Sequence, residues 1–168
     1  MPEDPRSKAG IIACSGEEMA EGTVSRLAAL KVLHSLRPHD TITLCLPLFL
    51  AGGPEDRTFA RLHPTITVDG CDLRCAARAT ELYSNKPAAS LVVSELVAER
   101  RLGKPEGRRQ LNEAGRQAVE VTAERIAALV DTLLDQERRA SNPAGGAGAP
   151  ARHEEGGDGC CCRSGSAA

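Results

Sequence analysis

Four of the seven cysteines have positions and spacing that suit metal binding or thiol chemistry: Cys14, Cys45, Cys71 and Cys75. The last two are four residues apart, a spacing that places side chains near one face of a helix. Thiolate sulfur is a preferred zinc ligand, and four thiolates form a closed tetrahedral site that is usually structural. The same residue type also serves as a nucleophile or a sulfur carrier, so residue types alone leave metal binding and thiol chemistry open.

Two other kinds of site are less well supported by the sequence. An iron–sulfur cluster also takes four cysteines, but the lack of short Cys-x-x-Cys runs favours zinc. Residues 15–23 contain two glycines and precede a predicted helix, as a phosphate loop would. That loop lacks a Gly-Lys-Ser/Thr ending and carries Glu17, Glu18 and Glu21, which would repel phosphate. We therefore do not expect nucleotide binding.

The elements that must position these cysteines alternate between strands and helices. Short runs of β-branched and apolar residues predict strands, and helical spacing of apolar residues predicts helices. The predicted strands are residues 10–14, 41–46, 65–69 and 89–93, and the predicted helices are residues 23–36, 55–62, 72–84 and 108–138. Residues 94–101 fit either state. This order predicts right-handed βαβ units in a single three-layer α/β domain, Rossmann-like, with a mainly parallel sheet of about four strands.

All strands of a parallel sheet end at one edge, where open α/β folds place their sites. Cys14 ends the first strand, Cys45 lies near the end of the second, and Cys71 follows the third. Cys75 lies in the first turn of the next helix, and Pro47 is interpreted as the stop of the second strand. The cysteines meet best if the first strand lies between the second and third. Helix N-termini beside Cys14 and Cys75 are expected to keep their thiolates charged.

Composition limits the partners and the compartment. The net charge of −2 and the presence of only three aromatic residues argue against nucleic-acid binding. The longest apolar run, residues 44–51, contains a proline and is far shorter than the about 20 residues of a membrane span. No secretion signal is visible near residue 1. We expect a cytoplasmic protein with reduced thiols and a metal ion as its partner.

The composition also divides the chain into three parts. Residues 1–9 are expected to be a flexible N-terminus, and residues 10–140 the cysteine-bearing domain. Residues 141–168 are rich in Gly, Ala and Pro and are expected to be a disordered tail. Cys160, Cys161 and Cys162 lie in this tail, and adjacent cysteines in a flexible segment are poorly suited to one tight site.

Three short motifs resemble a known family. They read IIACSG at residues 11–16, LCLP at 44–47 and VDGCD at 68–72. They are similar to the DGC-domain family, which is named for its central Asp-Gly-Cys motif and is associated with zinc binding. The resemblance covers about residues 11–140 and implies that Cys14, Cys45, Cys71 and Cys75 chelate Zn²⁺. It assigns no cellular role.

The sequence therefore predicts one zinc ion bound by four cysteines at the C-terminal edge of the sheet. The alternatives are a thiol-based enzyme or carrier that handles sulfur or thiophilic metals at the same cluster, and an iron–sulfur protein. Whether the chain is an enzyme stays open.

Overall fold

The computed structural model describes residues 8–14 and 16–141. One sheet has the strand order β2-β1-β3-β4, and every neighbouring pair is parallel. The strands are β1 (Ala9–Ala13), β2 (Thr41–Thr43), β3 (Thr65–Asp69) and β4 (Ala89–Val92). The predicted parallel sheet is confirmed, and so is the placement of the first strand between the second and third.

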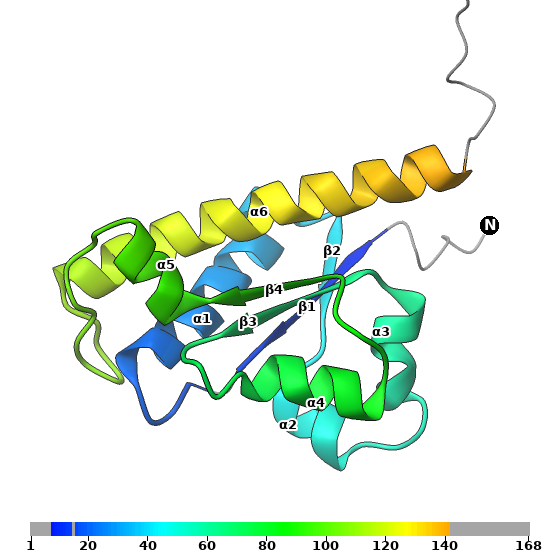
Figure 1. Ribbon diagram of the computed structural model, residues 1–168, viewed down its shortest axis with the longest axis horizontal. Coiled ribbons are helices and arrows are strands. Elements are labelled where there is room, and N and C mark those ends of the chain that lie inside the picture. The colour runs from blue at the N-terminus through cyan, green and yellow to red at the C-terminus, as the bar shows by residue number, and fades with distance from the viewer. Residues whose placement is uncertain (1–7, 15, 142–168) are drawn as a thin grey trace, which may run out of the picture.

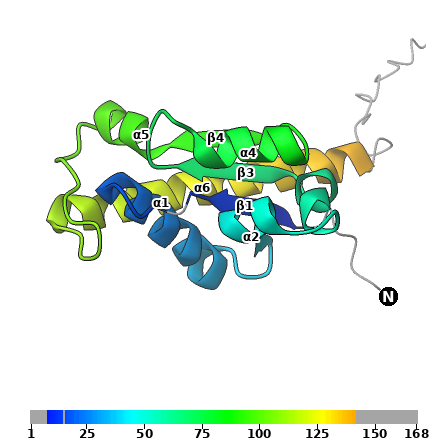
Figure 2. The same cartoon turned by 90° about the horizontal axis from the view of Figure 1, so that it is seen from below.

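Helices cover both faces of the sheet and complete the predicted three layers (Figure 1). One face carries α1 (Ala20–Lys31) with its π-helical continuation η2 (Val32–Leu36), α5 (Val93–Glu99) and α6 (Glu113–Ser141). The other carries α2 (Leu46–Ala51), η3 (Asp56–Thr58), α3 (Phe59–Leu62) and α4 (Cys75–Tyr83). Viewed from below, α2 and α4 lie in front of the strands and α6 behind them (Figure 2).

Side-chain alternation along the strands builds a separate core on each face. Ile11 packs into the core under α1 and α6, and the next residue, Ile12, packs with Phe49 and Phe59 on the opposite face. The helix after β1 and the helix after β3 lie on opposite faces. The carboxyl ends of β1 and β3 therefore flank a topological switch point, where open α/β sheets form a crevice.

The segment that carries Cys45 differs from its prediction. The strand ends at Thr43 instead of residue 46, and Leu46–Ala51 is a helix that was not predicted. Pro47 lies in the first turn of α2, where proline's missing N–H is harmless and its φ is already helical. The interpretation of Pro47 as a strand stop was therefore wrong. Cys45 is the residue that precedes α2.

The other differences concern element boundaries. The first long helix begins at Ala20, three residues before its predicted start at residue 23, and the last begins at Glu113, five residues after its predicted start at residue 108. Residues 93–99, of which most were left undecided, form α5. Within residues 8–14 and 16–141, no helix is both long and apolar enough to cross a membrane. The predictions for residues 1–7 and 142–168, including Cys160, Cys161 and Cys162, lie outside the described residues.

Candidate functional site

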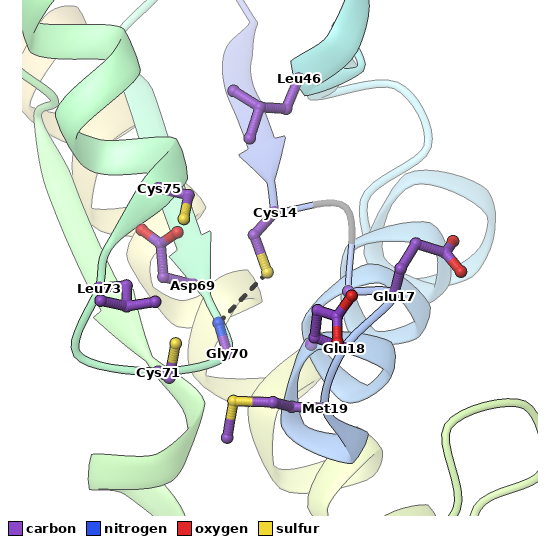
Figure 3. Close-up of a pocket in the computed structure, with 12 residues that line it drawn as sticks. Cys14, Glu17, Glu18, Met19, Leu46, Asp69, Gly70, Cys71, Leu73 and Cys75 are labelled. Carbon is purple, nitrogen blue, oxygen red and sulfur yellow. Dashed lines mark hydrogen bonds between the residues drawn. The ribbon is translucent and has the colours of Figure 1, made fainter.

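A cavity of about 250 Å³ lies where β1 and β3 end. Three of the four candidate ligands line it: Cys14 from the end of β1, Cys71 from the loop after β3, and Cys75 from the start of α4. Their sulfur atoms face the space between the two strand ends (Figure 3). The sequence-based prediction that a shared edge collects these cysteines therefore holds for three of them.

Hydrogen bonds orient the sulfur of Cys14. The Gly70 N–H donates to Cys14 Sγ at 3.3 Å, and Ser25 Oγ lies 3.1 Å from the same sulfur. The Ser25 hydroxyl donates to the Gly22 carbonyl at 2.7 Å, so the neutral Cys14 thiol donates to Ser25. Ser25 is fully buried, which makes this arrangement part of the packed interior. The Cys14 thiol is thus held in one orientation by its contacts.

Close backbone contact joins the loops that carry Cys14 and Cys71. Gly16 after β1, Gly22 in α1 and Gly70 after β3 meet without side chains between them. A Cβ on Gly70 would lie 2.6 Å from the Gly22 nitrogen and 2.7 Å from its Cα. Gly16 also has φ = 76°, a conformation that favours glycine. The glycines therefore set how closely the β1 and β3 ends approach each other.

Asp69 of the Asp-Gly-Cys motif holds the start of α4. Its carboxylate accepts the Ala76 N–H at 2.7 Å and the Ala77 N–H at 3.1 Å, two donors that a helix leaves unpaired at its first turn. Arg74, between the two cysteines, has a left-handed φ of 49°, which is unfavourable for a residue other than glycine. The two hydrogen bonds to Asp69 help to stabilise the loop in this conformation. Burial raises the pKa of Asp69, while the Ala76 and Ala77 N–H groups and the Arg74 charge oppose the shift.

This shift predicts a pH dependence of stability. Because the folded chain holds the Asp69 proton more tightly, the carboxyl contributes most below its unfolded pKa of about 3.9. Its contribution is lost as pH rises through the higher folded pKa. Asp69→Asn removes this ionisation, so the stability of the native chain minus that of the variant should decrease with rising pH. Urea unfolding from pH 3 to 8 in a chelator measures it, and a difference that increases with pH would contradict the assignment.

Burial raises the pKa of the Cys75 thiol, and electrostatic repulsion from Asp69, and from Cys14 and Cys71 when they are ionised, raises it further. The residue is exposed overall, but its sulfur faces the cavity. The expectation that a helix N-terminus would keep this thiolate charged is therefore wrong for Cys75, because desolvation and nearby negative charge outweigh the helix. Such a thiol is a poor nucleophile without a cation beside it.

The charges around the cavity favour cations. Glu17, Glu18 and Asp69 line it, and its described lining includes no Lys, Arg or His. Arg26 and Arg108 approach Glu17 and Glu18 only at 4.0 Å, between exposed side chains. Phosphate and other anions are disfavoured there.

Cys45 lies apart from this cavity. It lines a neighbouring one of about 340 Å³, together with Leu44 and Pro47, and it is exposed. In the described part of the chain, no three His, Cys, Asp or Glu side chains come close enough to hold a metal ion. The donors are thus right in kind for zinc, with three thiols in one cavity, but a closed site requires the sulfurs to move together.

Sequence reasoning missed several residues of the site. Met19 lines the cavity beside the cysteines, and Leu46 contributes to its wall. Ser25, which contacts Cys14, looks like an ordinary helix residue in the sequence. Asp69 accepts N–H groups of α4 although it lies five residues before the N-cap residue Arg74, so the usual N-cap signal in the sequence does not reveal this role.

Comparison with known proteins gives one relationship. A search of curated proteins and a search of solved structures each found no match. Residues 10–132 match the DGC domain, a range that includes all four candidate cysteines and most of the folded chain. The chain therefore belongs to the DGC-domain family.

Proposed function

We propose that this domain binds one zinc ion through Cys14, Cys71 and Cys75, with Cys45 as the fourth ligand. The observation that carries the proposal is the convergence of three thiols from two strand ends in one cavity. Zinc accepts four thiolate ligands in a tetrahedral arrangement, and its charge of +2 would offset half of their negative charge. The family match adds support, because the matched residues 10–132 include all four cysteines and the resemblance in sequence implies that they chelate zinc.

The electrostatics favour a cation over thiol catalysis. A catalytic cysteine needs a lowered pKa, whereas the pKa of Cys75 is raised by burial and by Asp69, Cys14 and Cys71. A divalent cation reverses this balance, since it stabilises the thiolates and releases their protons. Iron would bind the same donors, so the test must distinguish the two metals. A reducing compartment such as the cytoplasm would keep the thiols free to bind.

A second candidate is a carrier that handles thiophilic metals or sulfur at the same cysteines. Two observations favour it. Cys45 is exposed and lies in its own cavity, so one ligand is separated from the others. The cavity of about 250 Å³ is also much larger than one ion requires, given that about 10–15 Å³ of such volume already holds one water molecule. Both features suit an open, working site better than a closed structural one.

Metal analysis tests the proposal. Protein purified anaerobically should contain about one zinc per chain, the expectation for one four-ligand site. Cys71→Ser should remove most of the metal, because it deletes a ligand from the shared cavity. Cys160→Ser, a matched substitution outside the described residues, should leave the zinc content unchanged. Stoichiometric iron with a charge-transfer spectrum, or full zinc retention in Cys71→Ser, would contradict the assignment.

A further inference from the structure

The cavity of about 250 Å³ that Cys71 and Cys75 line (the first cavity) shares a wall with the cavity of about 340 Å³ that Cys45 lines (the second cavity). The residues of this wall suggest how a metal ion would move. Cys14, Glu17 and Leu46 line both cavities. Cys45 lines only the second, and Cys71 and Cys75 line only the first. The candidate ligands therefore form a series: the exposed Cys45, then Cys14, which both cavities share, then Cys71 and Cys75 in the first cavity.

We propose that Cys45 is an exchange ligand, which captures a thiophilic divalent cation at the second cavity and passes it to Cys14, Cys71 and Cys75. This inference rests on the proposed zinc binding and adds a direction to it. The domain would then take up and release its ion as cargo through one defined thiol. A structural zinc site would need no such ligand.

The difference between Cys45 and Cys14 is the first argument. Cys14 is half-buried, and its sulfur is oriented by the Gly70 N–H and by Ser25. Cys45 is exposed and lies between the end of β2 and the start of α2, two residues beyond the last strand residue. A thiol at such a junction can reach a molecule that delivers the metal ion and can then turn towards the first cavity. A ligand held like Cys14 can only receive the ion.

Charge supplies the second argument. The second cavity contains Arg26 as well as Glu17, with 4.0 Å between their charged groups. The first cavity adds Glu18 and Asp69 and has no basic residue in its described lining. A cation therefore finds a more negative environment as it passes from Cys45 towards Cys71. Glu17 lines both cavities, with its side chain 78% exposed.

Each transfer step is ligand exchange without redox change. At Cys45, one metal–sulfur bond forms as one metal–water bond breaks, and the thiol proton goes to water. The next steps add Cys14, Cys71 and Cys75 in the same way, with one further water and one proton released for each thiol. Release to an acceptor reverses this order. The bonds to Cys75, Cys71 and Cys14 break first, and Cys45 then carries the ion out of the first cavity.

Rates distinguish this role from that of an ordinary fourth ligand. The experiment uses the full chain with Cys160, Cys161 and Cys162 changed to serine, so that only the four candidate thiols remain. Zinc capture from a buffered solution and release to excess chelator are followed by stopped flow. Cys45→Ser should slow both capture and release by about tenfold or more and change the affinity much less. Cys45→His, which restores a metal ligand, should recover most of both rates.

Three other outcomes would contradict the exchange role or the proposed function. Faster release with unchanged capture would make Cys45 a plain fourth ligand and overturn the exchange role while keeping zinc binding. No change in either rate would remove Cys45 from the path. Absence of zinc binding in the parent chain would instead reject the proposed function itself.

Discussion

Replacing Phe49 with alanine should lower the free energy of unfolding by about 3–5 kcal/mol. Phe49 is fully buried and packs with Ile12, Leu46 and Phe59 under the sheet. Few other aromatic side chains are available to fill the space, because the chain has only two Phe, one Tyr and no Trp. The cavity left by the ring would therefore collapse poorly. Urea unfolding of the metal-free protein measures the loss.

Leu48 provides the matched control on the same helix. It is 47% exposed, so Leu48→Ala should change stability by no more than about 0.5 kcal/mol. Equal losses in the two variants would show that α2 is not anchored through Phe49. If α2 is anchored in this way, Phe49→Ala should also loosen the segment that carries Cys45.

The fold could be predicted because its signals are local and mutually consistent. β1 and β3 are short runs of β-branched and apolar residues, and both are buried. Helical spacing is equally plain in α6, whose buried residues recur along one face. The rule that parallel strands end at one edge then predicts that Cys14, Cys71 and Cys75 lie close together.

The segment after β2 could not be predicted in the same way. Residues 44–51 form a short apolar run, which periodicity cannot assign to a strand or to a buried helix. Tertiary structure decides it: β2 pairs with β1 only as far as Thr43, and Leu46 and Phe49 then find a core on the other face. The displacement of Cys45 from the predicted site follows from this one error.

The finer structure of the site depends on contacts that are distant in sequence. Ser25 reaches Cys14 because α1 packs beside the end of β1, and Gly22 meets Gly70 across the switch point. No local sequence pattern predicts either contact. The raised pKa of Cys75 likewise arises from burial and from charges on three other residues. The sequence could identify the thiols but not the direction of the Cys75 pKa shift.

Replacing Gly70 with alanine should impair both stability and zinc binding. The new Cβ would meet the backbone of Gly22 at 2.6–2.7 Å and the Glu21 carbonyl carbon at 2.9 Å, and backbone cannot move aside as a flexible side chain can. We expect a loss of about 1–3 kcal/mol in the free energy of unfolding, as for other overpacked sites. The β1 and β3 ends must separate, which weakens the Gly70 N–H bond to Cys14. Zinc affinity should fall by about 10–100-fold, the usual effect of disturbing groups that orient metal ligands.

Gly53→Ala is the control, because no atom lies within 4 Å of its added Cβ and its backbone is not in the left-handed region. It should change neither unfolding nor zinc affinity measurably. Chelator competition at a temperature where both variants are folded separates the binding effect from the stability effect. A Gly70→Ala protein that loses stability but keeps full affinity would show that the glycine contact supports the fold alone. Loss of both would place the spacing between Cys14 and Cys71 under the control of the backbone, because the substitution changes neither cysteine.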